Sequence, residues 1–138
     1  MMDEEEVRLR QVFDAEEIPE VDDASLKTFA RHLQTNLAPS VDVTGREDSP
    51  WEEFYVFGPG EPEEYAELKK SRRSYRDKFV LLRVLDEPSP SDDLVASVER
   101  LNDGKRFEID LSWLEAVDET SEDARLLDDF ASWQVNWQ

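Results

Sequence analysis

The chain contains no cysteine. This excludes disulfide bonds, thiolate nucleophiles and zinc sites built on sulfur, and it fits a reducing compartment. The four glycines do not have the spacing of a phosphate-binding loop. The one histidine, His32, has no second histidine with which to share a metal, and no serine lies in the elbow motif of a nucleophilic triad. We therefore expect a protein that is not an enzyme.

Long apolar runs are missing as well. No stretch reaches the length needed to span a bilayer. The first residues, MMDEEEVRLR, are acidic where a secretory signal peptide is basic. We expect a cytoplasmic protein with no membrane partner.

Positive charge is scarce. Lysine and arginine number 16 against 35 aspartate and glutamate residues, for a formal net charge of -19. Such a field repels nucleic acid, because binding there depends on neutralising phosphates with lysine and arginine. It favours divalent cations, a basic protein or a salty solvent instead.

The few basic residues are unevenly spread. One short segment could form a phosphate-binding patch, or its side chains could lie against the many carboxylates of the same chain. The segment contains Lys69, Lys70, Arg72, Arg73, Arg76 and Lys78.

Aromatic residues are plentiful for so charged a chain, with four Trp, seven Phe and three Tyr, and this indicates a folded core. An apolar stripe from Leu26 to Leu37 predicts a helix with Asp22 or Asp23 as its N-cap, ending before Pro39. A second helix follows Thr120, which we expect to be its N-cap, with Asp123 as the reciprocal partner in a capping box.

Alternating or apolar runs predict strands between these helices, over residues 40–45, 51–58, 78–85, 94–101 and 105–111. Asn102, Asp103 and Gly104 predict a tight hairpin turn. Several short strands with such a hairpin and a closing apolar turn suggest an α+β fold, a small SH3-like β-barrel with an N-terminal and a C-terminal helix packed on it. We expect an acidic arm over residues 1–23, either solvated or partly ordered as a helix, and a single α+β domain over residues 24–138.

Carboxylates gather in two places, and carboxylate oxygens are the ligands that Ca²⁺ prefers. The chain has no EF-hand pattern, so we expect loose sites that the ion itself must order. The candidate metal ligands are Asp86, Glu87, Asp92 and Asp93 around a Pro-Ser loop, and Asp118, Glu119, Glu122 and Asp123 around the start of the last helix. Two alternatives stay open: solvated surface charge for both groups, and stabilisation of the helix N-terminus for the second.

The C-terminal segment FEIDLSWLEAVDETSEDARLLDDFASW resembles the closing segment of the cyanobacterial-type calcium-binding protein family (CcbP-like). Upstream, FARHLQTNLAP is similar to an early helix of that family. The resemblance covers about half the chain and implies an SH3-like domain that binds Ca²⁺ through surface carboxylates. It carries Asp118 and Glu119 over as acidic site positions. The other matching positions are Leu33, Leu37, Pro39, Leu111, Ser112, Leu114, Glu115 and Trp133.

The first functional hypothesis is therefore a non-enzymatic, monomeric Ca²⁺-binding protein that buffers or senses the ion. The alternative is an acidic adaptor that binds a basic protein, either by neutralising a toxin or by mimicking nucleic acid, because spaced carboxylates can imitate a phosphate backbone. A third hypothesis is that the charge serves only as an adaptation to salt.

Overall fold

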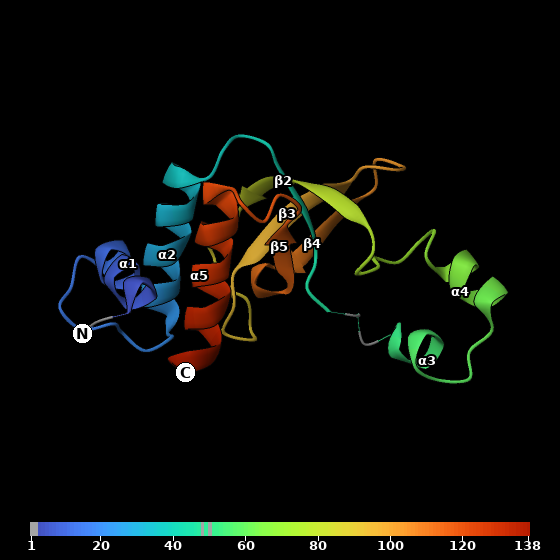
Figure 1. Cartoon of the computed structure of the whole chain (residues 1–138), viewed down its shortest axis with the longest axis horizontal. Coiled ribbons are helices and arrows are strands. Elements are labelled where there is room, and N and C mark those ends of the chain that lie inside the picture. Colours follow the sequence, from blue (N-terminus) through green and yellow to red (C-terminus); the bar gives the residue numbers. More distant parts are fainter. Residues whose placement is uncertain (1–2, 48, 50) are drawn as a thin grey trace.

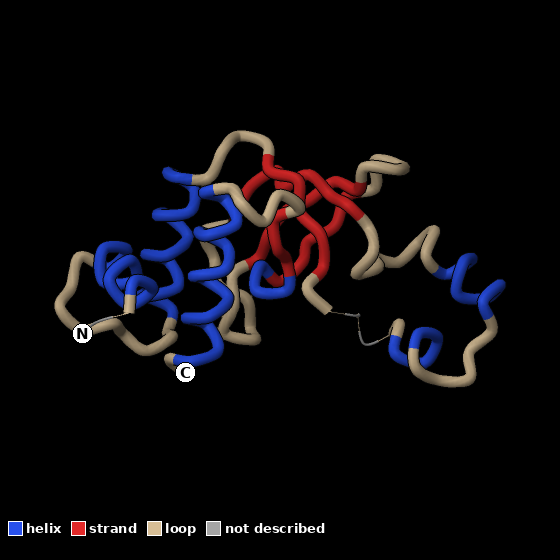
Figure 2. Tube along the Cα trace, viewed as in Figure 1, coloured by secondary structure: helices blue, strands red, loops and turns tan. Residues whose placement is uncertain are grey.

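The computed structural model describes residues 3–47, 49 and 51–138, so the first two residues of the predicted arm lie outside the described ranges. An antiparallel sheet occupies the middle of the molecule, α1, α2 and α5 stand together beside it, and α3 and α4 project at the other end (Figure 1). Figure 2 shows the same division into a helical layer, a sheet and a projecting part. No helix in the described ranges is long and apolar enough to cross a membrane. The elements are α1 Glu4–Phe13, α2 Asp23–Asn36, β1 Val41–Gly45, α3 Glu53–Val56, α4 Pro62–Leu68, β2 Lys78–Val84, β3 Val95–Arg100, β4 Arg106–Asp110, the 3-10 helix η1 Leu111–Trp113, β5 Leu114–Ala116 and α5 Glu122–Asn136.

The five strands are ordered β4-β3-β2-β1-β5, and each neighbouring pair is antiparallel. Among the described residues β4 and β5 do not pair, so the sheet is open and the predicted barrel does not close. A barrel closes only when its first and last strands meet along their length, and β5 has just three residues. The mixture of helices and antiparallel strands is as predicted, whereas the SH3-like topology stays a prediction.

The hairpin between β3 and β4 is confirmed. Gly104 has a positive φ of 72°, which glycine adopts without strain. Its N–H donates to the carbonyl of Arg100 at 2.8 Å and closes the turn.

The strand predicted over residues 51–58 is wrong, because Glu53–Val56 form the short helix α3. The backbone carbonyl of Glu52 accepts hydrogen bonds from the N–H groups of Tyr55 and Val56, both at 2.9 Å. The Glu52 carboxylate also accepts from the N–H of Ser49 at 3.1 Å. These contacts curl the chain where the alternating polarity of the sequence indicated an extended strand.

The core lies between the sheet and the pair α2 and α5. The predicted apolar stripe of α2 is buried from Leu26 to Leu33. Phe29 contacts Phe130 and Trp133 of α5, with ring centroids 5.1 and 5.2 Å apart. Aromatic burial of this kind stabilises the helical layer against the high surface charge.

The N-cap of α2 agrees with the prediction from the sequence, whereas the N-cap of α5 does not. Asp22 is the N-cap of α2 and forms a capping box with Ser25. The N-cap of α5 is Ser121, which accepts from the N–H of Ala124 at 3.0 Å, so the prediction of Thr120 is wrong. Thr120 donates to the Asp118 carboxylate instead, at 2.7 Å.

Residues 4–13 form the helix α1. Of the two forms expected for the N-terminal arm, solvated or partly ordered as a helix, this is the second. Leu9 is fully buried. The Arg8 guanidinium donates two hydrogen bonds to the Asp129 carboxylate on α5, at 2.7 and 2.9 Å. Helix α1 is therefore docked on the helical layer, while the division of the chain at residue 23 stays a prediction.

Residues 46–77, which we call the lobe, leave the sheet after β1 and return to it at β2. The lobe contains α3 and α4 and extends away from the helical layer (Figure 1).

Candidate functional site

The predicted carboxylates of the Pro-Ser loop, between β2 and β3, are held apart by separate contacts. Asp86 accepts a hydrogen bond from the Gln34 amide of α2 at 2.8 Å. The backbone carbonyl of Asp92 accepts from the Gln134 amide, near the end of α5, at 3.0 Å. Glu87 is exposed. The loop is thus hydrogen-bonded to two different helices, α2 and α5.

Asp93 is buried, although it follows an exposed aspartate in the sequence. Its carboxylate accepts from the N–H of Leu94 at 2.8 Å, from the N–H of Ser112 at 3.2 Å and from the Ser112 hydroxyl. Burial raises the pKa of Asp93, against the opposing effect of these hydrogen bonds. Asp93 therefore connects the loop to η1 through hydrogen bonds, and both of its carboxylate oxygens accept hydrogen bonds within the protein.

The second predicted group surrounds the start of α5, where its members also have local partners. Asp118 accepts from the hydroxyl and the N–H of Thr120, and these bonds lower the pKa of Asp118. Asp123 accepts from the N–H of Ala38 at 3.1 Å. Asp118 is exposed, as are Glu119, which has no described contact to a basic group, and Glu122, which lies 3.4 Å from Arg125.

Asp86 of the first group contacts Gln34 of α2, four residues before Ala38, which is the contact of Asp123. Asp92, by contrast, contacts α5 near its end, whereas Asp123 lies in the first turn. A helix rises 1.5 Å per residue, so the stretch from Asp123 to Gln134 is about 17 Å long. Across the described part of the chain, no three acidic or histidine side chains are arranged to hold a metal ion. The structure thus separates Asp92 from the second group, and its described ranges contain no preformed ligand set.

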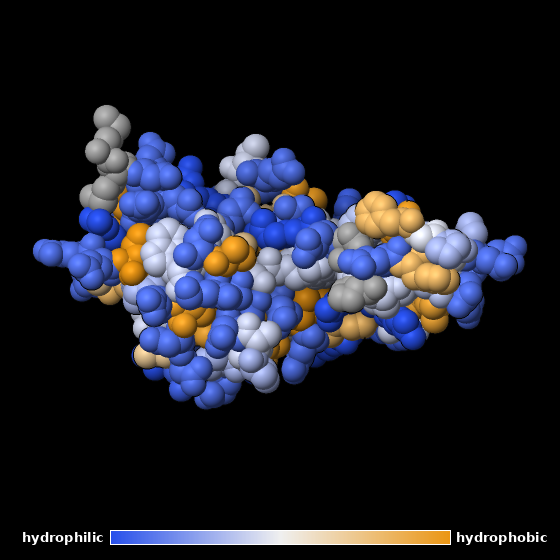
Figure 3. Space-filling view, turned by 90° about the horizontal axis from the view of Figure 1, so that it is seen from below, coloured by the Kyte–Doolittle hydropathy of each residue, from blue (hydrophilic) through white to orange (hydrophobic). Residues whose placement is uncertain are grey.

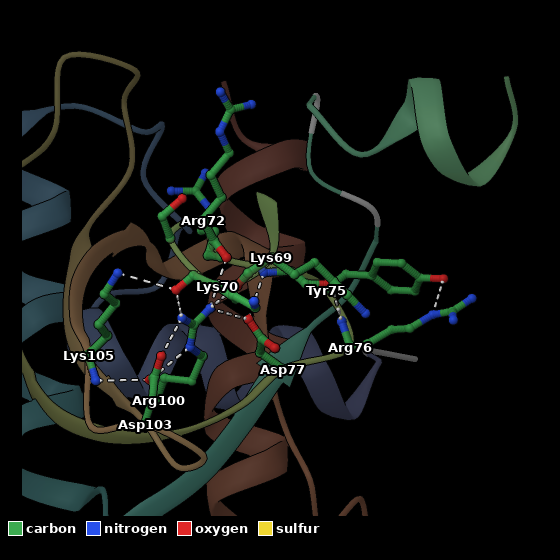
Figure 4. A network of polar contacts seen from close by, with 12 residues as sticks. Lys69, Lys70, Arg72, Tyr75, Arg76, Asp77, Arg100, Asp103 and Lys105 are labelled. Carbon is green, nitrogen blue, oxygen red and sulfur yellow. Dashed lines mark hydrogen bonds and ion pairs between the residues drawn. The ribbon is translucent and has the colours of Figure 1, made fainter. Parts of the chain in front are cut away.

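The basic segment of the lobe is anchored through its backbone by a buried arginine that sequence reasoning missed (Figure 4). The Arg100 side chain is only 1% exposed. It donates to the carbonyls of Lys69, Lys70 and Arg72 at 2.7–2.9 Å.

Two carboxylates complete the contacts of this guanidinium. Asp77 lies 3.1 Å from it and Asp103 2.6 Å. Hydrogen bonds from Arg100 lower the pKa of Asp103 to about 2. In the sequence Arg100 reads as one more polar residue of an alternating strand, so nothing there marks it as buried.

A second buried charge holds the inside of the lobe together. Glu52 is fully buried, and its carboxylate accepts from the Tyr65 and Ser74 hydroxyls at 2.7 and 2.6 Å and from the N–H of Tyr75 at 2.9 Å. Together with the bond from Ser49, these hydrogen bonds outweigh the burial that would raise the pKa of Glu52, and the pKa lies below its usual value.

A groove of about 590 Å³ separates the lobe from the body of the protein. Trp113 of η1 lies in it, with Arg73 of the lobe over the indole ring at 5.3 Å. Arg46 at its edge pairs with Asp128 at 2.8 Å. Carboxylates and guanidinium groups therefore both line the groove, which gives it no single charge. The polar lining residues are Arg46, Glu47, Glu53, Arg73, Asp110 and Ser112.

His32 takes no part in any of these clusters. It is half-buried on the flank of α2, edge-on to Phe29 at 6.1 Å, and burial lowers its pKa.

The fold is similar to a solved structure, the crystal structure of CcbP from Anabaena, with a TM-score of 0.55 and 14% sequence identity. The likeness covers 96% of this chain and 91% of that chain, so it extends well beyond the half of the chain for which the sequence predicted it. No family model and no curated protein sequence matches the chain. The comparison shows a CcbP-like fold.

Proposed function

We propose that this protein is a non-enzymatic acidic Ca²⁺-binding protein of the cytoplasm, which buffers or senses the ion through surface carboxylates. The observation that carries the proposal is the CcbP-like fold over nearly the whole chain. This likeness of the fold agrees with the resemblance of the C-terminal segment to the CcbP-like calcium-binding family. The net charge of -19 supplies the attraction for a divalent cation.

The contacts of the carboxylates determine what kind of binding to expect. Exposed oxygens are available at Glu87, Glu119 and Glu122, whereas Asp93 is occupied by hydrogen bonds. An ion that binds the exposed groups must order its own ligands, and this lowers affinity. We therefore expect dissociation constants in the micromolar-to-millimolar range.

Calorimetric titration with Ca²⁺ and with Mg²⁺ at physiological salt tests the proposal, accompanied by residue-resolved NMR. The variant Asp118→Asn/Glu119→Gln should weaken the Ca²⁺-induced shifts at the start of α5. The matched control is Glu16→Gln/Glu17→Gln, which removes the same charge from two exposed residues outside both groups. Absence of heat, of NMR shifts and of any change in thermal midpoint with millimolar Ca²⁺ would overturn the proposal.

A basic protein partner stays a prediction. It would use the same carboxylates, so Ca²⁺ should compete with it. Capture of a cationic protein that is lost at raised salt and indifferent to Ca²⁺ would favour the adaptor alternative.

A further inference from the structure

Four side chains of the basic segment, residues 69–78, lie over aromatic rings and not against carboxylates of the chain. Among the described residues only Lys70 of the segment pairs with a carboxylate, that of Glu67, and both are largely exposed. The positive charge of the others is therefore not cancelled by an ion pair. The cation–aromatic pairs are Lys69 over Tyr65 at 4.7 Å, Arg72 over Trp51 at 5.5 Å, Arg73 over Trp113 at 5.3 Å and Arg76 over Tyr75 at 5.3 Å. The Arg76 Nε–H also donates to the Tyr75 hydroxyl at 2.9 Å.

Two of these cations share one aromatic cluster. Trp51 contacts Tyr65 with ring centroids 5.7 Å apart, and Tyr65 stacks on Tyr55 at 5.5 Å with an interplanar angle of 9°. Lys69 and Arg72 therefore lie over neighbouring rings of a single surface.

Next to these rings lie large apolar side chains that are exposed to solvent. Phe54 lies edge-on to Tyr55 at 5.1 Å and is 52% exposed, and Phe57 is 78% exposed. Figure 3 shows hydrophobic residues gathered on the lobe beside hydrophilic ones. We call these side chains the lobe surface; they are Trp51, Phe54, Tyr55, Phe57, Tyr65, Lys69 and Arg72.

The lobe surface is held in place by the two buried charges. Glu52 contacts the segments on both sides of α3 and α4, and Arg100 fixes the backbone of Lys69 and Arg72 to the sheet. Burying a charge costs free energy unless every polar atom is paired, so these residues contribute more to a defined geometry than to stability. A surface ordered in advance loses little entropy when it binds a partner.

We propose that the lobe surface docks an acidic segment of a partner protein that also carries apolar side chains. An arginine stacked on an aromatic ring presents its N–H edge outward, and that edge matches a carboxylate or a phosphate bidentately. Phe54 and Phe57 supply the apolar contacts that mark protein interfaces. The proposal is independent of Ca²⁺ binding by the carboxylates.

Charge around the lobe surface favours a peptide over nucleic acid. Helix α4 carries the exposed acids Glu63, Glu64 and Glu67 beside the cations, and the whole chain is strongly negative. A long polyanion would meet this repulsion along its length. A peptide can place its few acidic groups on the cations and its apolar groups on the phenylalanines.

The test uses the full chain and a fluorescein-labelled peptide in which glutamate alternates with leucine, followed by fluorescence polarisation. The variant Lys69→Ala/Arg72→Ala should weaken binding by about tenfold or more, as expected for the loss of about 1.4 kcal/mol. Because Arg100 binds only the backbone carbonyls of these two residues, alanine keeps the anchor. The control Lys27→Ala/Arg31→Ala removes the same charge from exposed positions of α2.

Further arms decide the chemistry of the partner. Phe57→Ser should weaken binding, whereas Val7→Ser on α1 should not. A peptide with phosphoserine in place of glutamate separates phosphate from carboxylate as the preferred anion. Binding that is absent, that is equal in the lobe and control variants, or that is tighter for a single-stranded oligonucleotide than for the peptide overturns the proposal.

Discussion

Glu52 is a carboxylate with no exposed surface and four hydrogen-bond donors around it. In Glu52→Ala the N–H groups of Ser49 and Tyr75 and the hydroxyls of Tyr65 and Ser74 all lose the carboxylate as their partner. We expect a loss of about 2–3 kcal/mol in the stability of the lobe. Hydrogen exchange over residues 51–77 measures it. Glu53→Ala, at the exposed neighbouring position, is the control, and equal protection in both variants would contradict the assigned role of Glu52.

Asp103 gives the Arg100 contact a defined pH dependence. Its pKa of about 2 in the folded protein lies below the usual value of 3.8, because Arg100 donates hydrogen bonds to the ionised form. The pair therefore stabilises the fold above about pH 4, and this contribution is lost as the pH falls toward about 2.

NMR titration of the Asp103 carboxyl carbon measures this pKa directly. The Asp103→Asn variant should lose less stability between about pH 4 and about pH 2 than the unmodified protein does. A carboxyl that titrates near 3.8 would contradict the short contact with Arg100.

Helix α1 shows how a weak local signal becomes ordered by tertiary contacts. Its ten residues are too few to form a stable isolated helix, and Leu9 is its one buried residue. Leu9→Ala should therefore lower the free energy of unfolding by about 2–4 kcal/mol. Val7→Ala, at a 38% exposed position of the same helix, should change it by less than about 0.5 kcal/mol. Urea denaturation compares the two, and equal stabilities would mean that α1 is not docked.

Elements with strong local signals were predictable from the sequence. The α2 stripe, its Asp22 cap and the Gly104 hairpin each follow from residue types a few positions apart. Closure of the barrel and the form of residues 51–58 depend on distant partners. Glu52, for example, accepts hydrogen bonds from residues 13 to 23 positions later in the chain. The local periodicity of polar and apolar residues does not indicate such contacts.

The candidate site was less predictable than the fold, because a carboxylate's role depends on what surrounds it. Asp92 and Asp93 are identical neighbours in sequence, yet one is exposed and the other is buried. Within the first predicted group, Asp86 contacts α2 whereas Asp92 contacts α5 near its end, and composition does not show this difference. Tertiary structure alone supplies this information.

The charge of the whole molecule predicts a strong dependence of stability on salt. The chain has 35 acidic residues and only 16 basic ones, and the excess negative charges repel one another in the compact state. Raising NaCl from about 0.01 to about 1 M shortens the screening length from about 30 to about 3 Å and should raise the thermal midpoint. A gain of about 1 kcal/mol would move the midpoint by about 3–6 °C. A midpoint independent of salt would contradict this account.

Calcium separates screening from binding in the same experiment. CaCl₂ at millimolar concentration should raise the midpoint more than NaCl at equal ionic strength, because a bound ion stabilises only the folded state. In Asp118→Asn/Glu119→Gln the excess over NaCl should shrink, while the NaCl effect itself changes little, since most of the charge remains. Equal midpoints in the two salts would leave screening as the whole effect, and a chain that folds only in molar salt would identify the acidity as an adaptation to its solvent.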